Sequence, residues 1–480
     1  MIEVLSVASE AYPLIKTGGL ADVVGALPSA LAPHGVSMRV LLPGYPKVMD
    51  ALASSGREVW YYPDFFGGEA RLIAGRAGGL DVIALEAHHL FTRPGSPYLA
   101  PDGRDFPDNW RRYAALSFAA YELSCGIVEG YRPDILHCHD WQSGLVPAYV
   151  KYNAGSTAKT IITVHNIAFQ GVVGWDAFNA LRLDYAAAGD GAIEYFGNIS
   201  YLKAGLATAD AITTVSPTYA QEILTPEYGC GLEGLLLKRY NDLSGILNGV
   251  DHEEWSPGSD PALPAPFTAE DPAGKAVCKA ALQRELGLPE NPALPLFANI
   301  SRLTDQKGSA LIVQTLRGLL DAGEALQFAL LGSGERSLEN AFRDLSKRFP
   351  DQVAARIGFD PALSHRIEAG ADFYLMPSRF EPCGLNQLYS LRYGAIPIVR
   401  ATGGLQDSVI DPRENAAQAT GIKFIPSTEA ALKKAILKAL ALWKEPAWLQ
   451  HIRHNGMTAD FSWEKQAAEY VALYESVCRE

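Results

Sequence analysis

Short apolar runs alternate with longer amphipathic stretches along most of this chain. The runs have the length of buried strands and lie at residues 2–8, 38–42, 80–84, 135–138, 159–164 and 211–215, then at 294–300, 327–331, 353–357, 373–377 and 396–399. Apolar residues at helical spacing fill most of the intervals, as they do over residues 20–31. This alternation predicts an α/β protein with parallel, doubly wound sheets.

A proline-rich interval divides the pattern into two parts. Between Gly249 and Pro295 prolines recur, and helical spacing is found only over residues 273–286. Such a segment is typical of an interdomain connection. We therefore expect two Rossmann-like lobes, an N-terminal lobe at residues 1–247 and a C-terminal lobe at 248–456. The last segment, residues 457–480, is expected to form a helix that either closes the second lobe or crosses back onto the first.

Composition narrows the class of protein. With 480 residues, 48% hydrophobic and 20% charged, the chain is long enough for about two or three well-packed domains. The net charge of −13 argues against nucleic acid or an anionic membrane as the main partner. Its 6 cysteines form no CxxC pair, and the chain shows no leader-like start and no membrane-length apolar run. These features predict a cytoplasmic enzyme.

A glycine turn occurs twice, near opposite ends of the chain. The motif TGGLxD stands at residues 17–22 and again at 402–407. In the first copy it follows a predicted strand, opens a predicted helix and is preceded by Lys16. Glycines let a ligand approach the backbone, and a helix start presents free N–H groups, so this turn predicts a phosphate site. The second copy has no preceding lysine and is expected to shape the same ligand pocket.

The second part of the chain supplies further charges after predicted strands. Arg302 and Lys307 follow the strand at residues 294–300, and Glu381 and Gly384 follow the strand at 373–377. Open α/β sheets bind ligands at the carboxyl ends of their strands. Two cations there would neutralise the charge that grows on a leaving diphosphate.

Histidines and one aspartate end two strands of the first part. His137, His139 and Asp140 close the strand at residues 135–138, and His165 closes the next one. His137 and His139 share one side of the strand, because alternate residues point to opposite faces. A metal site is one interpretation, but no further ligand cluster completes a tetrahedral set. Polar residues lining a ligand site are the preferred interpretation.

Two common nucleotide-binding motifs are missing. Neither part has a G-x-G-x-x-G turn after its first strand, which a nicotinamide dehydrogenase requires, and there is no Walker-type phosphate loop. A dehydrogenase is therefore disfavoured.

Taken together, the motifs resemble those of bacterial glycogen synthases, relatives of the plant starch synthases. The segments that carry the resemblance are KTGGLAD (16–22), HDW (139–141), TVHN (163–166), SRL with QKG (301–303 and 306–308), PSRFEPCGL (377–385) and TGGL (402–405). They keep the family's order over essentially the whole chain. The resemblance implies the GT-B architecture, two Rossmann-like lobes facing a deep cleft. It also implies a retaining glucosyltransferase that moves glucose from ADP-glucose to the non-reducing 4-hydroxyl of an α-1,4-glucan, without a metal or other cofactor.

The resemblance also assigns roles to residues. Lys16, with the backbone of Gly18 and Gly19, would contact the donor from the first lobe, and Arg302 and Lys307 would hold its diphosphate from the second. The expected catalytic residues are Lys16, Asp140, His165, Arg302, Lys307 and Glu381. The remaining contacts to ADP-glucose are expected from Asp22, Asn248, Phe359 (on the adenine), Cys383, Gly384, Leu385 and Thr402.

Within these roles, Glu381 would bind glucose hydroxyls and His165 would lie beside the anomeric carbon. Retention then follows either from double displacement or from front-face attack, and the latter is preferred because no carboxylate is evident on the opposite face. Two alternatives stay open: another retaining nucleotide-sugar glucosyltransferase, and an inactive glucan-binding regulator on the same scaffold. A glycogen phosphorylase is disfavoured, because it would need a lysine-bound pyridoxal phosphate and a much longer chain.

Overall fold

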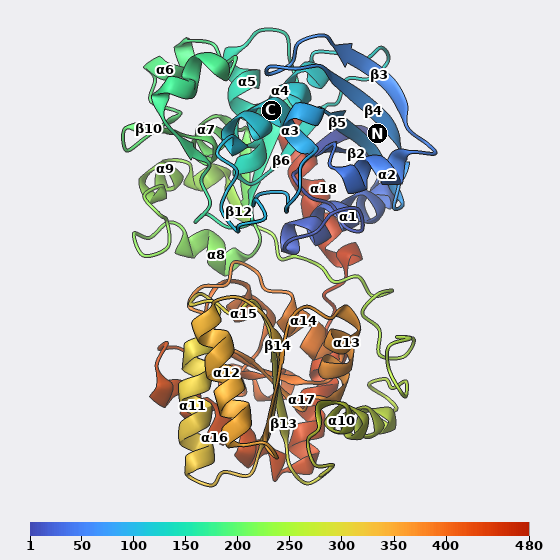
Figure 1. Ribbon diagram of the computed structural model, residues 1–480, viewed down its shortest axis with the longest axis vertical. Helices are drawn as coiled ribbons and strands as arrows, with labels where there is room; N and C mark the ends of the chain where they lie inside the picture. Colours follow the sequence, from blue (N-terminus) through green and yellow to red (C-terminus); the bar gives the residue numbers. More distant parts are fainter. Residues whose placement is uncertain (480) are drawn as a thin grey trace. The chain divides into compact units, whose positions relative to one another are not determined.

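The structure, a computed structural model, describes residues 1–479 and divides the chain into two compact units (Figure 1). Unit 1 comprises Met1–Gly249 together with the chain from Trp463 onward, and unit 2 comprises Val250–Ser462. The sequence pattern had placed these divisions at 247/248 and 456/457. Each unit has its own sheet flanked by helices, parallel in unit 2 and mainly parallel in unit 1, so the predicted pair of doubly wound α/β lobes is confirmed.

Unit 1 is built on a nine-stranded sheet in the order β12-β11-β7-β6-β1-β2-β5-β4-β3. Its strands are β1 (Ile2–Val7), β2 (Val36–Pro43), β3 (Arg57–Tyr62), β4 (Ala70–Ala77), β5 (Leu80–Glu86), β6 (Ile135–His139), β7 (Lys159–Val164), β11 (Ala211–Thr214) and β12 (Leu243–Gly245). The chain passes from β1 to β2 on one side and later to β6 on the other. The strand order therefore reverses between β1 and β6, which is where open sheets of this type bind ligands.

One edge of this sheet differs from the prediction of parallel strands. β3 and β4 were not predicted, and β4 pairs antiparallel with both β3 and β5. β3 is mostly exposed, so its Val-Trp-Tyr-Tyr segment (59–62) does not form part of a buried strand. A small antiparallel sheet was missed as well, and it consists of β8 (Val172–Val173), β10 (Asn198–Ser200) and β9 (Glu194–Tyr195).

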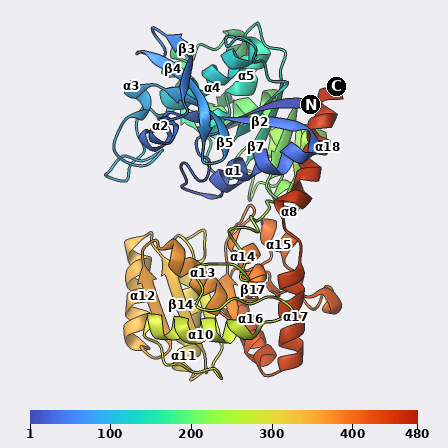
Figure 2. The same cartoon turned by 90° about the vertical axis from the view of Figure 1, so that its right-hand side faces the viewer.

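The last helix belongs to unit 1, although unit 2 precedes it in the chain. α18 (Trp463–Arg479) buries Trp463, Ala467, Tyr470, Tyr474 and Val477, a spacing that forms one face of a helix. This face packs with α1 (Gly19–Leu31) against the sheet (Figure 2). The other helices of the unit are α2 (Pro46–Leu52), α3 (His88–Phe91), α4 (Asn109–Ser124), α5 (Val146–Tyr152), α6 (Ala186–Gly189), α7 (Tyr201–Thr208), α8 (Pro217–Glu222) and α9 (Glu233–Lys238).

Unit 2 contains a six-stranded parallel sheet in the order β15-β14-β13-β16-β17-β18. Its strands are β13 (Leu296–Ile300), β14 (Gln327–Gly332), β15 (Val353–Ile357), β16 (Phe373–Met376), β17 (Ile396–Arg400) and β18 (Ile422–Phe424). Its helices are α10 (Ala273–Leu286), α11 (Ser309–Asp321), α12 (Arg336–Arg348), α13 (Pro361–Gly370), α14 (Asn386–Arg392), α15 (Gly403–Ser408), α16 (Glu429–Trp443) and α17 (Pro446–Thr458). The strand order reverses between β13 and β16.

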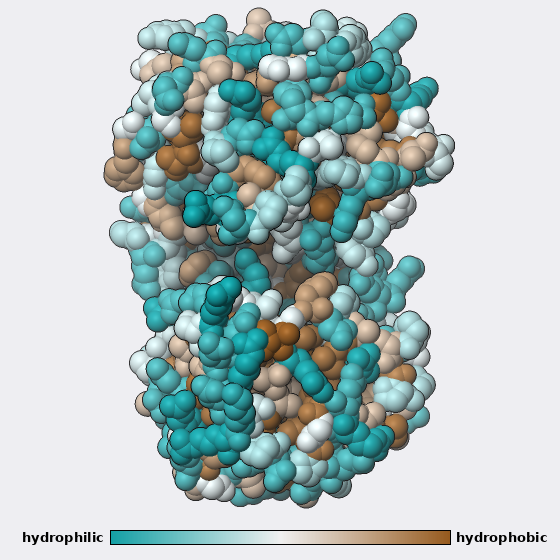
Figure 3. All heavy atoms as spheres, viewed as in Figure 1, coloured by the Kyte–Doolittle hydropathy of each residue, from teal (hydrophilic) through white to brown (hydrophobic). Residues whose placement is uncertain are grey.

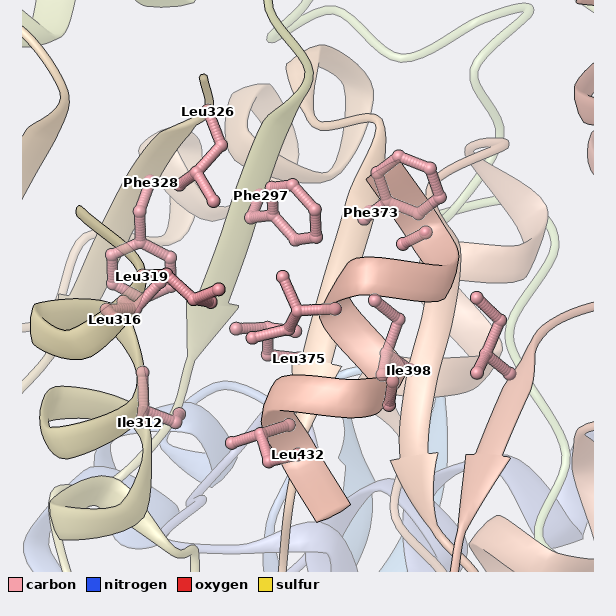
Figure 4. Close-up of a cluster of buried hydrophobic side chains, with 14 of the residues drawn as sticks. Phe297, Ile312, Leu316, Leu319, Leu326, Phe328, Phe373, Leu375, Ile398 and Leu432 are labelled. Carbon is pink, nitrogen blue, oxygen red and sulfur yellow. The ribbon is translucent and has the colours of Figure 1, made fainter. Parts of the chain in front are cut away.

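The packing of the core of unit 2 explains why its strands consist of continuous apolar residues. Phe297, Phe328, Phe373, Leu375 and Ile398 project from neighbouring strands toward helices α11 and α16 (Figure 4). Strands covered on both faces need apolar residues at successive positions. Helix α12 lies on the outside of unit 2 and presents a hydrophilic face to solvent (Figure 3). Phe342 and Leu345 are its buried residues. No helix within residues 1–479 combines the length and the apolar character needed to span a membrane.

Candidate active site

The loop after β1 carries the first group of predicted residues. Lys16 lies here and its Nζ donates to Asp22 Oδ1 at 2.6 Å, with 44% of the lysine side chain exposed. Burial raises the pKa of Asp22, and the nearby Lys16 opposes that shift. The N–H groups at the start of α1 follow directly, after the exposed Gly18 in an extended conformation. The arrangement puts a lysine and the N-terminus of a helix at one end of the sheet, as an anion site requires.

Glu10 anchors this loop through hydrogen bonds, a role that the sequence did not predict. Its buried carboxylate, 2% exposed, accepts hydrogen bonds from Thr17 Oγ1 at 2.6 Å, from the Thr17 N–H and from the Tyr98 hydroxyl. These bonds fix the residue that follows Lys16. A single acid just after a buried strand was the only signal in the sequence, and its partner Tyr98 lies far along the chain.

Asp140 lies at the carboxyl end of β6, next to β1. Its Oδ1 accepts the backbone N–H of His165 at 2.6 Å and that of Asn166 at 3.3 Å, so it joins the ends of β6 and β7. Burial raises the pKa of Asp140 to about 7, although the two N–H donors favour its ionised form. The backbone of Asp140 has a φ of 56°, an unusual value that marks a strained position for a non-glycine residue.

Three histidines gather beside Asp140. The rings of His137 and His139 lie 4.3 Å apart between centroids, on one side of β6 as predicted. His139 Nδ1 lies 3.0 Å from His165 Nε2. Burial lowers the pKa of His165 and of His137 to about 3, and it lowers that of His139 as well, so all three rings are neutral at neutral pH. Within residues 1–479 no group of His, Cys, Asp or Glu is arranged to hold a metal ion.

In unit 2, the loops after β13 and β16 bring predicted residues together. Lys307 Nζ contacts both carboxylate oxygens of Glu381, at 2.8 and 2.6 Å, and the Ser378 hydroxyl donates to Glu381 Oε2 at 2.9 Å. The Glu381 side chain is 6% exposed and that of Lys307 is 20% exposed. Arg302, in contrast, is exposed and makes no hydrogen bond or ion pair with residues 1–479. The loop after β13 therefore carries both an exposed guanidinium, without a partner in residues 1–479, and the lysine of a buried ion pair.

The second glycine turn supports the loop that holds Glu381. The Gly404 N–H donates to the carbonyl oxygens of Glu381 and Pro382, both at 3.1 Å. A Cβ on Gly403 would overlap the Glu381 carbonyl, and one on Gly404 would overlap that of Cys383. Only glycines allow this close approach, so the turn that Thr402 begins shapes the 381–385 loop. The loop continues through Gly384, at φ 74°, and Leu385 into α14.

Two further predicted contact residues differ in exposure. Phe359 follows β15 and is 90% exposed, which leaves its ring free to stack on a flat ligand. Asn248 is only 4% exposed, and its Oδ1 has no hydrogen-bond partner in the part of the chain that the structure describes. Within each unit the structure thus gathers most of the predicted residues at the carboxyl ends of the central strands.

Known proteins share this organisation over the full chain. The family model described as "Starch synthase catalytic domain" matches residues 3–238, and "Glycosyl transferases group 1" matches residues 280–451. A glycogen synthase of Rhodopseudomonas palustris (strain HaA2) is 50% identical over 476 residues, 98% of each chain. Glycogen synthase 1 of Rhizobium meliloti (strain 1021) is 47% identical over 480 residues, 99% of each chain.

A solved structure gives the same result. The catalytic domain of starch synthase IV from Arabidopsis thaliana, bound to ADP and acarbose, matches with a TM-score of 0.87 and 34% identity, over 100% of both chains. The two Rossmann-like units and these matches define the class of protein, a glycosyltransferase with the GT-B fold. More particularly, the chain belongs to the glycogen synthase family, as its motifs predicted.

Proposed function

We propose that this protein is a glycogen synthase that transfers glucose from ADP-glucose to the non-reducing 4-hydroxyl of an α-1,4-glucan, with retention of configuration. The observation that carries the proposal is the group Arg302, Lys307 and Glu381 at the point where the strand order of unit 2 reverses. A relative with the same fold is described as bound to ADP. We further propose a cytoplasmic location, on the strength of six scattered cysteines that form no disulfide.

The diphosphate is the part of the donor that most needs protein groups. Breaking the glycosyl–phosphate bond leaves negative charge on ADP and positive character on the sugar. Arg302 has no partner among the described residues 1–479 and is available to both phosphates, and a guanidinium matches phosphate oxygens in pairs. Lys307 adds a second cation close by. Fixed charges of this kind stabilise the transition state most when they need no rearrangement.

Glu381 fits a sugar-binding role better than a nucleophilic one. Both of its oxygens already accept hydrogen bonds, from Lys307 and Ser378, and the side chain is almost fully buried. A carboxylate nucleophile requires an oxygen aimed at the anomeric carbon. We therefore favour attack from the same face as the leaving phosphate. Detection of a covalent glucosyl-Glu381 intermediate by mass spectrometry would contradict this mechanism.

In unit 1, Lys16 and the N–H groups at the start of α1 are proposed to contact the donor, and His165 to contact the transferred glucose. The low pKa of His165, about 3, means that the ring acts as a neutral hydrogen-bonding group and carries no charge. Phe359 is proposed to stack on the adenine, because its ring is exposed beside the end of β15.

The test is incorporation of labelled glucose from ADP-glucose into glycogen by the purified full chain, with UDP-glucose assayed in parallel. We expect transfer from ADP-glucose and release of the label by an exo-glucosidase specific for α-1,4 linkages. Arg302→Ala serves as the folded control and should be nearly inactive. A folded wild-type protein that labels glycogen from neither donor would refute the proposed function and leave the inactive glucan-binding scaffold as the alternative.

A further inference from the structure

A chain of hydrogen bonds runs from β1 to His165 through a fully buried histidine. Ser6 Oγ lies 3.1 Å from His139 Nε2, and His139 Nδ1 lies 3.0 Å from His165 Nε2. Ser6 and His139 are both 0% exposed. The other ring nitrogen of His165, Nδ1, has no hydrogen-bond partner within residues 1–479 and is not among the buried polar atoms. This series of hydrogen bonds therefore begins at a buried serine of the sheet and ends at His165 Nδ1, an atom that a ligand can reach.

The protons along this chain are fixed by a count of donors. Each neutral imidazole carries one proton, so only one of His139 Nδ1 and His165 Nε2 is protonated. Both rings are neutral because burial lowers their pKa. Two arrangements remain. Either Ser6 donates to His139 and His139 donates to His165, or every bond runs in the reverse direction.

The hydroxyl of Ser6 distinguishes between these two directions of donation. Within residues 1–479 its hydroxyl has one hydrogen-bond partner, His139 Nε2. In the reverse arrangement this hydroxyl would accept from His139, and its own O–H would be buried with no acceptor. A buried donor left without a partner costs free energy. In the forward arrangement Ser6 donates, and every buried hydrogen in the chain is used.

From this count we infer that Ser6 and His139 fix His165 as the tautomer protonated on Nδ1, so that His165 presents an N–H donor to its ligand. Its ligand atom must then be a hydrogen-bond acceptor, such as a hydroxyl oxygen of the transferred sugar. Nδ1 cannot accept a proton from a nucleophile in this state, which excludes His165 as the general base. His139 is a positioning residue, because it acts through His165. This role in transfer rests on the proposed function, but the tautomer itself does not.

His137 belongs to a separate chain and provides the control. Its Nδ1 bonds the Tyr474 hydroxyl of α18 at 2.8 Å, and its Nε2 bonds Thr163 Oγ1 at 2.7 Å. No hydrogen bond joins this chain to His139 or His165 within residues 1–479, although the rings of His137 and His139 are in contact. Tyr474→Phe thus removes one buried hydroxyl from a neighbouring histidine and leaves the Ser6–His139–His165 chain intact.

The primary test is the tautomer of His165 in the wild-type full chain, read from ¹H–¹⁵N correlations of ¹⁵N-histidine-labelled protein. We expect Nδ1 to give a protonated, pyrrole-type signal and Nε2 an unprotonated one, unchanged between pH 6 and 8 because the pKa is about 3. A proton on Nε2, or an equal mixture of tautomers, would overturn the inference. The signal is assigned by its loss in His165→Asn.

Variants then connect the tautomer with turnover. Ser6→Ala and His139→Phe should both give a mixture of His165 tautomers and lower kcat on the order of 10- to 100-fold, with the KM for glycogen unchanged. Ser6→Thr, which keeps the hydroxyl, should restore the wild-type tautomer, and Tyr474→Phe should not alter it. Unchanged tautomer populations in folded Ser6→Ala would also overturn the inference.

If the wild type shows the expected tautomer but transfers no glucose, the proposed function is wrong, while the inferred hydrogen bonds from Ser6 to His165 remain supported.

Discussion

The two residues proposed to hold the diphosphate, Arg302 and Lys307, lie in different environments. Lys307 is bound to Glu381 in a partly buried ion pair, whereas Arg302 is exposed and has no partner within residues 1–479. Removing a free, exposed charge leaves no group uncompensated, but removing one member of a buried pair does. The two residues therefore allow the contribution to catalysis to be separated from the contribution to stability.

We expect Arg302→Ala to lower kcat/KM by roughly 10²–10³-fold with little change in Tm, because it removes one stabilising charge from the transition state. Lys307→Ala should cause a similar loss of activity and also lower Tm, because Glu381 stays buried without its cation. Steady-state kinetics and thermal unfolding of both variants check this. Equal Tm changes in the two would mean that the Lys307–Glu381 pair does not stabilise the fold.

Asp140 predicts a pH dependence of stability. Its pKa is about 7 in the folded protein and near 3.8 when unfolded, so between these values the folded state binds more protons. Stability from this group is present below pH 3.8 and is lost as the pH rises toward 7. Asp140→Asn keeps the acceptor Oδ1 but cannot ionise. Relative to wild type, the variant should gain about 2–4 kcal/mol between pH 4 and pH 8.

Thermal unfolding at pH 5 and pH 8 measures this effect. The difference in Tm between Asp140→Asn and wild type should shift in favour of the variant at pH 8. Since all other groups titrate equally in both proteins, a difference that is independent of pH would show that Asp140 is ionised throughout this range.

At the scale of elements, the two copies of TGGL have different tasks. The first opens α1, and a Cβ on Gly18 would meet no atom within 4 Å. The second opens α15 and packs against the backbone of the Glu381 loop. The same sequence thus provides an exposed turn in unit 1 and a closely packed support in unit 2.

Gly404→Ala should therefore displace the 381–385 loop, lower Tm by several degrees and reduce kcat/KM by about 100-fold or more, because the Cβ would overlap the Cys383 carbonyl. Gly18→Ala is the matched glycine variant, and its Tm should stay close to that of the wild type. Thermal unfolding and the transfer assay compare the two. A Gly404→Ala protein with normal stability would show that the loop moves easily.

Helix α18 is an integral part of unit 1. Ala467→Asp would place a charge in the core that α18 shares with α1 and the sheet, where Ala467 is 0% exposed. We expect Tm to fall by roughly 10 °C, as for an unpaired buried charge. Ala472→Asp, on the exposed face of the same helix, is the control and should leave Tm unchanged. Similar Tm values for both variants would mean that α18 is not needed for the stability of unit 1.

At the scale of the whole molecule, the chain forms two units with separate cores, and each collects functional residues at the carboxyl ends of its central strands. The two residues proposed to hold the diphosphate, Arg302 and Lys307, belong to unit 2. ADP alone, without the sugar, is therefore expected to act mainly on that unit.

In hydrogen exchange of the full chain, saturating ADP should slow the amides of residues 301–308 and 377–385 by up to about 100-fold, which corresponds to ligand near 100 times its Kd. The small sheet β8–β10 should exchange at its original rate. Arg302→Ala should remove the protection. If ADP instead protected only unit 1, the assignment of the diphosphate to Arg302 and Lys307 would be wrong.

Much of the fold was readable from the sequence. Except for the short β18, which was not predicted, the buried strands of both sheets and helix α10 fall where periodicity placed them, because strands covered on both faces require continuous apolar runs. The edge strand β3 and its partly buried neighbour β4 have no fully buried apolar run, since part of each strand faces solvent. Glu10 was given no role for a different reason. Its partners Thr17 and Tyr98 are recognised only when the chain is folded.

By itself, the sequence determined the two α/β units, the family and the residue types of the candidate site, because these depend on local periodicity and on motifs within short segments. Only the tertiary structure decided how those residues are paired. It joined Lys307 to Glu381 across 74 positions and Ser6 to His139 across 133. It also placed α18 in unit 1, and it buried His137 and His139 next to a partly buried His165, where desolvation keeps all three rings neutral. Charge state and partner choice depend on burial and on contacts between distant segments, which no local pattern encodes.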